Sequence, residues 1–216
     1  MQILLVAATP FEIAPTFSWL QTHFQQRSEG VFEKNGLLVQ TLVTGVGMTA
    51  TAFHLGNCFT QNRPDWAINA GIAGAFDANL NLGDVVQIVS ERFSDLGVEE
   101  ADGWFTDLEE LGFLPLSSFS NPQPPIPNLR SCHGSTVNKV HGAEASIQKI
   151  RDKYPEIQVE SMEGAAFFYA CLAAGVPFAE IRSISNRVEP RNRDAWDLPL
   201  AIRNLNGVLV GMLEVM

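Results

Sequence analysis

The alternation of short apolar runs with longer helical runs is the feature that most constrains how this chain can fold. Residues 2–8 and 66–70 predict buried strands, while residues 49–60 and 162–174 predict helices. Strands that alternate with helices indicate an α/β protein with a largely parallel sheet. We therefore expect one domain over residues 1–216, a three-layer α/β/α sandwich around a central mixed, largely parallel sheet.

The rest of the chain supplies further elements of both kinds. Asn35-Gly36 separates two apolar runs and is a strong signal for a hairpin turn. The remaining predicted elements are helices near 10–24, 142–153 and 194–213, and strands near 30–33, 37–44, 85–92, 130–140 and 177–185.

Residues 93–128 differ in character from the rest of the chain. They mix acidic and aromatic side chains and end in a proline-rich run, which can form neither a helix nor a central strand. An irregular segment of this length predicts a lid, a substrate flap or an oligomer contact.

Composition and charge exclude several classes of partner. The chain carries 14 Lys and Arg against 24 Asp and Glu, a formal net charge of −10, whereas surfaces that bind nucleic acid are basic. Cys58, Cys132 and Cys171 are scattered without a Cys-x-x-Cys motif, and the histidines lack metal-ligand spacing, so we expect a reducing compartment and no metal. The acidic balance fits a cytoplasmic enzyme with a small-molecule ligand. No signal peptide and no membrane-spanning run is predicted.

Residues 160–167 join an extended run to a strongly helical one. Ligands of α/β proteins bind where strands end, so Met162 and Glu163, expected on the first helical turn, are candidate binding residues. A carboxylate can accept two hydrogen bonds from a vicinal diol such as that of a ribose. Glu163 could instead only complement the helix dipole, an effect of about 0.3–1 kcal/mol.

Three other strand exits, meaning the segments at the carboxyl ends of predicted strands, carry polar or small residues. Glu12 follows the first strand, where it forms a capping box with Thr9 or serves as a carboxylate at the mouth of a site. Gly47 ends a glycine-rich turn that lets backbone N–H groups approach a ligand. Ala73 and Gly74 belong to a second exit composed of small residues.

Taken together and in this order, the exits resemble those of the nucleoside phosphorylase/hydrolase superfamily. The Met-Glu-Gly-Ala element at 162–165, with Glu12 after the first strand, is similar to the branch of methylthioadenosine/S-adenosylhomocysteine nucleosidases and futalosine hydrolases. The runs at 160–167 and 184–196 look most like the futalosine hydrolases of menaquinone biosynthesis. The resemblance implies hydrolysis of futalosine to hypoxanthine and dehypoxanthinyl futalosine, with no metal or organic cofactor, by a homodimer or larger homo-oligomer.

The resemblance also implies residue roles. Glu12 would be the general base that deprotonates a water molecule, and Glu163 would hold the ribose hydroxyls with Met162 packed on the sugar. Asn186 stands where adenine-specific relatives carry an aspartate. The other residues expected to bind substrate are Ser161, Gly47, Ala73, Gly74 and Arg191.

Asn186 favours a 6-oxopurine over adenine. Its amide can donate to O6 and accept from N7–H, whereas an ionised carboxylate would repel O6. A mismatch would cost about 1–3 kcal/mol. Asn186 could alternatively be a loop residue that favours a turn.

The carboxylate on the 5′ side of futalosine would suit an arginine, because the guanidinium group binds carboxylates in a bidentate fork. Arg187, Arg191 and Arg193 are the candidates. The aromatic ring of that tail would meet Trp104, Phe105 or Phe119.

Three alternatives remain beside futalosine hydrolysis. A phosphorylase would need a cationic pocket, but the loop after the first strand holds Glu12 and no arginine. An adenine-cleaving nucleosidase is disfavoured by Asn186. A nucleoside-binding protein without catalysis is expected to lack Glu12 or Glu163, and both are present.

Overall fold

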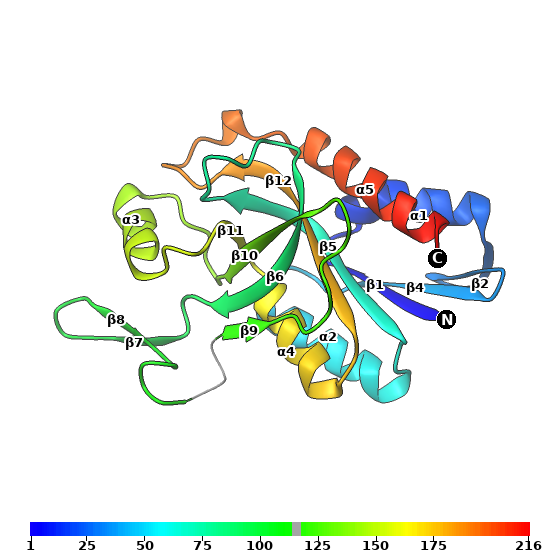
Figure 1. Ribbon diagram of the computed structural model, residues 1–216, viewed down its shortest axis with the longest axis horizontal. Helices are drawn as coiled ribbons and strands as arrows, with labels where there is room; N and C mark the ends of the chain where they lie inside the picture. Colours follow the sequence, from blue (N-terminus) through cyan, green and yellow to red (C-terminus); the bar gives the residue numbers. More distant parts are fainter. Residues whose placement is uncertain (114–117) are drawn as a thin grey trace.

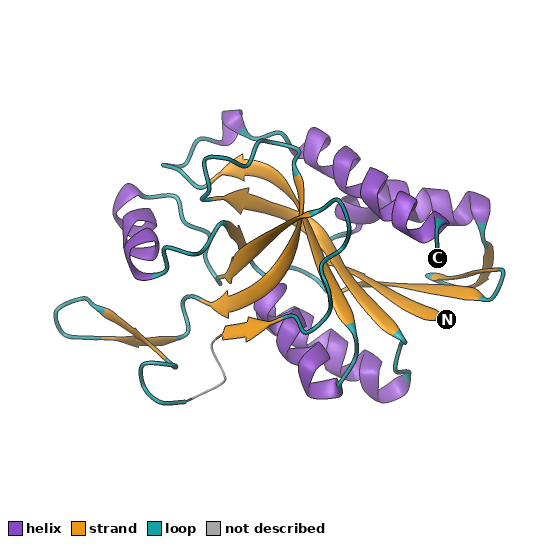
Figure 2. Ribbon diagram, in the orientation of Figure 1, coloured by secondary structure: helices purple, strands orange, loops and turns teal. Residues whose placement is uncertain are grey.

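A sheet with helices on both faces forms the molecule in the computed structural model, which describes residues 1–113 and 118–216 (Figures 1 and 2). Among the described residues, ten strands form one sheet in the order β11-β10-β6-β12-β5-β1-β4-β3-β2, with β9 beside β6. The strands are β1 Gln2–Ala7, β2 Gln25–Ser28, β3 Val31–Lys34, β4 Leu37–Val43, β5 Trp66–Ala75, β6 Val85–Phe93, β7 Gly97–Glu99, β8 Phe105–Asp107, β9 Ser118–Ser120, β10 Arg130–Thr136, β11 Val159–Ser161 and β12 Phe178–Arg187. The helices are α1 Pro10–His23, α2 Met48–Gln61, α3 Glu144–Lys153, α4 Gly164–Ala174, the short 3-10 helix η1 Arg193–Ala195 and α5 Leu198–Glu214.

The central strands are buried on both faces, as their continuous apolar sequences require. In β1, Ile3 and Leu5 pack with α1 and α5, while Leu4 and Val6 pack with α2 and α4. Figure 1 shows the first helix pair on one side of the sheet and the second pair on the other. The predicted α/β fold with a mixed, largely parallel sheet is confirmed. No helix of the described ranges is long and apolar enough to cross a membrane.

Part of the sheet closes on itself. β5 runs parallel to β1 and β12, and β10 runs parallel to β6 and β11. β12 and β6 are antiparallel, and β11 also pairs antiparallel with β5. This last pairing places β11 and β12 on the two edges of β5, so that residues far apart in sequence meet at its carboxyl end.

Tertiary pairing lengthens one predicted strand. β5 was expected to end at Ala70 but continues to Ala75, because β12 pairs with it through Ala75 and β11 pairs with Gly74 and Ala75. Ala73 and Gly74 are therefore strand residues and not part of an exit turn. The predicted hairpin turn is present, with positive φ angles of 52° at Asn35 and 84° at Gly36.

Several other predicted boundaries were wrong by two to four residues. β10 ends at Thr136 and α3 begins at Glu144, because the backbone between them bonds elsewhere: Glu160 accepts from the N–H of His141, and Gly142 accepts from that of Arg191. α4 begins at Gly164 with Glu163 as its N-cap residue. α5 begins at Leu198, because Asp197 caps it by accepting from the N–H of Leu200 at 2.9 Å.

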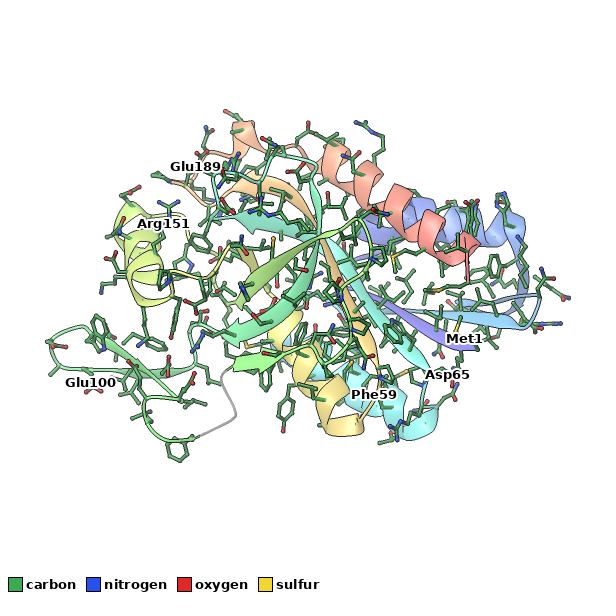
Figure 3. All side chains as sticks on the ribbon, viewed as in Figure 1. Met1, Phe59, Asp65, Glu100, Arg151 and Glu189 are labelled. Carbon is green, nitrogen blue, oxygen red and sulfur yellow. The ribbon has the colours of Figure 1, made fainter. Side chains whose placement is uncertain are left out.

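The segment 93–128 is more regular than predicted. It contains β7 and β8, which form a separate two-stranded hairpin, and β9; residues 114–117 lie outside the described residues. The hairpin projects from the body beside α3, with Glu100 near its outer end (Figures 1 and 3). Asp107 anchors it by accepting from the hydroxyl of Tyr154 at 2.7 Å and pairing with Arg92 at 3.3 Å.

A buried side chain ties α5 to the first turns of α1. Pro15 lies inside α1 and lacks the N–H that a helix interior uses. Beside it, Asn206 accepts from the N–H of Thr16 at 3.0 Å and donates to the carbonyl of Glu12 at 2.8 Å. Those two backbone groups are the pair that an ordinary helical hydrogen bond would join. Asn206 therefore positions the turn that carries Glu12.

We expect Asn206→Ala to lower the free energy of unfolding by about 2–4 kcal/mol, because it leaves several buried polar groups without partners. Denaturant titration measures the change. Gln21→Ala on the exposed face of α1 is the control and should stay within about 0.5 kcal/mol of wild type. A change in Asn206→Ala as small as that of the control would contradict the bridging role.

Candidate active site

A cavity of about 550 Å³ opens at the carboxyl ends of β1, β5 and β12. Its size is within the usual range for small-molecule sites. Its wall includes seven of the predicted site residues: Glu12, Ala73, Gly74, Ser161, Met162, Glu163 and Asn186. None of the described residues of the 93–128 segment lines it. Strand exits that are separated along the chain thus meet around one space, as the topology of α/β sheets dictates.

Both oxygens of Glu12 are engaged. Oε2 accepts from the N–H and the hydroxyl of Thr9, at 2.8 and 3.0 Å, and Oε1 accepts from the N–H of Ile72 at 3.1 Å. The carboxylate is almost fully buried and lines the cavity. Glu12 therefore forms the predicted capping box through Oε2, and its side chain also lies in the cavity wall.

Glu163 is held by a glycine turn. The N–H of Gly47 donates to its Oε1 at 2.9 Å, from a backbone with φ of 97° that favours glycine. Gly47 does not line the cavity itself but orients the carboxylate that does. Burial raises the pKa of Glu163, and the nearby charge of Glu12 adds to that effect, while Arg182 and the Gly47 N–H oppose it.

Arg182 is a charged residue beside the cavity that the sequence analysis missed. It lies 1 % exposed beneath the cavity, with Nε 2.9 Å from Oε1 of Glu180. Burial tends to lower the pKa of Arg182, but the carboxylates of Glu180, Glu163, Glu12 and Glu91 outweigh it and raise the pKa. Charged residues two apart in a strand face the same side, so the Glu180–Arg182 spacing was an available signal.

Gly71 makes the approach of this arginine possible. A Cβ atom there would collide with Nη1 of Arg182 and lie 2.8 Å from Oε1 of Glu12. Arg182 and Glu12 therefore both reach the space that the absent side chain leaves. A guanidinium and a carboxylate converging in this way can hold a water molecule between a donor and an acceptor.

A second pair of acids lies under the N-terminus of α4. Burial, followed by the charge of Glu180, raises the pKa of Glu91 well above its ordinary value, which favours its protonated form. The hydroxyl of Thr136 donates to Oε2 of Glu91 at 2.8 Å. Gly164 leaves room for both acids, since a Cβ atom there would collide with Glu91 and lie 2.6 Å from Oε1 of Glu180. The guanidinium of Arg182 thus offsets part of the negative charge buried below the cavity.

A β-bulge aims Asn186 into the cavity. The register of β12 against β5 shifts between Ile184 and Asn186, so Ser185 is the extra residue. The Ser185 hydroxyl donates to Oδ1 of Asn186 at 2.9 Å, and Nδ2 of Asn186 donates to the Arg187 carbonyl at 2.9 Å. Asn186 therefore belongs to a strand, and the alternative that it only favours a loop turn was wrong.

The predicted arginines lie elsewhere. Arg191 borders a smaller space of about 50 Å³ next to the main cavity, and its guanidinium carbon lies 5.4 Å from the ring centre of Trp196. Nη1 of Arg187 donates to the Asp77 carbonyl at 2.8 Å, and Arg193 lies 6.0 Å from the same Trp196 ring. Within the described residues, no arginine or lysine is in the wall of the main cavity.

Much of the cavity wall is apolar. Its exposed or half-buried apolar members are Phe11, Val46, Ile72, Val140, Met162, Trp196, Leu198 and Ile202. Trp104, Phe105 and Phe119, which were expected to meet an aromatic tail, do not line the cavity within this chain. Among the described side chains, no cluster of three His, Cys, Asp or Glu residues could hold a metal ion.

Comparison with known proteins agrees with the geometry. Residues 129–214 match the model of the family described as the phosphorylase superfamily. A futalosine hydrolase of Acidothermus cellulolyticus is 33% identical over 94% of this chain and 85% of that protein. A 5′-methylthioadenosine/S-adenosylhomocysteine nucleosidase of Glaesserella parasuis is 29% identical over 83% of this chain and 82% of that protein.

Solved structures show the same fold. The native futalosine hydrolase of Helicobacter pylori superposes with a TM-score of 0.80 at 16% identity, over 100% of this chain and 98% of that one. A Neisseria meningitidis nucleosidase in complex with methylthio-immucillin-A gives a TM-score of 0.77 at 19% identity, over 100% and 99% of the two chains. At these identities the likeness establishes the shared fold.

The raised pKa of Glu163 predicts how stability depends on pH. A raised folded-state pKa stabilises the protein below the ordinary value near 4.5, and this contribution is lost as pH rises through the folded-state pKa. Glu163→Gln cannot titrate, so its stability relative to wild type should increase as pH rises from 4 to about 7. Denaturant titration across that range measures the difference. The exposed Glu144→Gln gives the baseline, and a pH-independent difference for Glu163→Gln would contradict this assignment.

Proposed function

Because this chain belongs to the phosphorylase superfamily and, within it, to the futalosine hydrolase family, we propose that it hydrolyses the N-glycosidic bond of futalosine. The products would be hypoxanthine and dehypoxanthinyl futalosine, as in the menaquinone pathway. The observation that carries the proposal is the meeting of Glu12, Glu163 and Asn186 in one cavity. These three groups match the three parts of a nucleoside hydrolysis: the attacking water, the ribose and the base.

Glu12 is the proposed general base. Cleavage builds positive charge on the ribose, and a water molecule then attacks its anomeric carbon. Oε1 of Glu12 faces the space shared with Arg182, so it can take a proton from a water that the guanidinium holds. The Thr9 contacts fix Oε2 and leave Oε1 in a defined direction.

Glu163 is the proposed ribose ligand. Its Oε1 already accepts from Gly47, and a carboxylate has further lone pairs for the 2′ and 3′ hydroxyls. Met162 precedes it in the cavity wall and offers an apolar surface for the sugar. The partial positive charge at the N-terminus of α4 lies close to the same carboxylate.

Water is the better nucleophile for this site than phosphate. Phosphate would need uncompensated cationic groups, but no arginine or lysine lines the described wall, and the charge of the nearby Arg182 is offset by surrounding carboxylates. Glu12 and Glu163 would repel the anion. A phosphorylase is therefore disfavoured. A nucleosidase that removes adenine from methylthioadenosine is the second candidate, because the apolar side of the cavity would also accept a methylthio group.

Exposed apolar side chains in and beside the cavity wall suggest an interface with a second copy of the chain. Phe11 and Val46 line the cavity yet are 77% and 57% exposed, and Phe53 on the neighbouring α2 is 69% exposed. We infer that a homodimer or larger homo-oligomer covers these side chains. The three cysteines are free thiols, in keeping with the proposed cytoplasmic location.

The test is base release from futalosine, inosine and methylthioadenosine, measured side by side with and without phosphate. We expect fast, phosphate-independent release of hypoxanthine from futalosine. Glu12→Gln should lower kcat by about 10²- to 10⁴-fold, because it removes the general base. Glu29→Gln, on the exposed turn between β2 and β3, should leave kcat unchanged. Faster release of adenine from methylthioadenosine would show that the protein is an adenine-cleaving nucleosidase instead.

Asn186→Asp should shift base preference toward adenine. The carboxylate would repel O6 of a 6-oxopurine and, when protonated, donate to N7 of adenine. We expect kcat/KM for futalosine to fall by about 5- to 150-fold, and the ratio of adenine to hypoxanthine release to rise. Equal losses on both bases would show that Asn186 does not read the base.

A further inference from the structure

Glu160 is a buried acid that the proposed reaction leaves without a role. It is 4% exposed and lies in the wall of the main cavity and of the smaller space beside it. Asn186 and Gly74 border both spaces as well. Burying a carboxylate is costly unless it is hydrogen-bonded or paired. Its presence beside Asn186, where the base is proposed to bind, therefore needs an explanation.

The sheet register brings Glu160 and Asn186 to the same place. Gly74 pairs with Glu160 of β11 on one edge and with Asn186 of β12 on the other. Directly paired residues project from the same face of a sheet. Gly74 has no side chain between them, and a Cβ atom there would lie 3.0 Å from Nδ2 of Asn186. A ligand that lies over Gly74 is therefore flanked by both polar side chains.

His141 fixes the carboxylate in one orientation. Its backbone N–H donates to Oε1 of Glu160 at 3.0 Å, and its Nδ1 contacts Oε2. A carboxylate can only accept, so the proposed role of Glu160 has Nδ1 of His141 as the donor in this contact. Each oxygen keeps a further lone pair for a ligand. The anion is thus held by donors at both oxygens and remains an acceptor toward the cavity.

An acceptor at Glu160 distinguishes the two purine classes at N1, an atom that the proposed contacts of Asn186 do not involve. A 6-oxopurine carries a hydrogen on N1 and donates there, whereas N1 of adenine is an unprotonated acceptor. The amide of Asn186, whose two ends contact Ser185 and Arg187, is proposed to meet the N7 and O6 side of the base and so does not test the hydrogen on N1. A carboxylate is only an acceptor, so it binds N1–H and repels the lone pair of adenine N1.

We propose that Glu160, oriented by His141, is a second base-reading residue that accepts N1–H of a 6-oxopurine and selects it over a 6-aminopurine. This inference rests on the proposed function, because it assumes that the purine occupies the Asn186 end of the cavity. It makes Glu160 and Asn186 a pair of readers on the two sides of Gly74. Arg191 and Trp196 then close the space behind the base.

Calorimetric binding of free hypoxanthine and adenine to wild type and Glu160→Gln tests this reading. We expect wild type to prefer hypoxanthine, and the preference to fall by about 10- to 100-fold in Glu160→Gln, whose amide can donate to adenine N1. Glu156→Gln, an exposed acid just before β11, is the matched control and should keep the wild-type ratio. Equal weakening of both bases by Glu160→Gln would reduce Glu160 to a structural residue and overturn the proposal.

A measurement on the unchanged protein avoids any effect of substitution on folding. 1-Methylhypoxanthine lacks the N1 hydrogen and should bind wild type at least about 10-fold more weakly than hypoxanthine. Equal affinity for the two compounds would overturn the proposal.

Kinetics separate this proposal from the proposed function. Glu160→Gln should lower kcat/KM for futalosine relative to that for its 6-amino analogue by about the same 10- to 100-fold. If wild type hydrolyses neither compound but the base-binding results hold, the proposed reaction fails while Glu160 remains a base reader. If wild type hydrolyses futalosine and Glu160→Gln leaves the ratio unchanged, Glu160 is not a reader.

Discussion

The arrangement of the cavity depends on one buried cation, Arg182, in the middle of β12. Its pKa is raised because Glu180, Glu163, Glu12 and Glu91 surround it. Without it, the acids beneath the cavity would lose their counter-charge at a depth where solvent cannot replace it. The same guanidinium needs the bare backbone of Gly71 in order to reach Glu12. A residue without a side chain at position 71 of β5 is therefore required for Arg182 to reach these carboxylates.

Local patterning predicted much of the fold and of the site. The apolar run of β1, the hairpin turn at Asn35 and the helical run of α4 are decided by side chains a few residues apart, so their existence could be predicted. Glu12 and Glu163 could be predicted as site residues because each follows a strand, and ligands of α/β proteins bind where strands end. The family resemblance added Asn186 and the direction of the chemistry.

The features that were missed depend on contacts between distant segments. β5 extends past Ala70 because strands on both of its edges pair with it, and no local sequence signal reveals those partners. The β-bulge at Ser185 and the contact of His141 with Glu160 arise in the same way. A histidine on a connecting segment carries no local indication of its partner. Residues 93–128 contain strands because Asp107 and its partners hold the hairpin against α3.

The bridge from Asn206 to the first turns of α1 has a consequence for biosynthesis. The side chain that completes the helix at Thr16 lies 190 residues further along the chain, so it is synthesised much later than Thr16. The backbone around Glu12 must therefore wait for Asn206, and β12, which supplies Arg182, also follows long after α1. Contacts of such long sequence separation form slowly, since the chain entropy between them must be lost first. The candidate site therefore cannot form in a nascent chain until α5 docks. Until then, the face of the sheet that α1 and α5 cover stays exposed to chaperones.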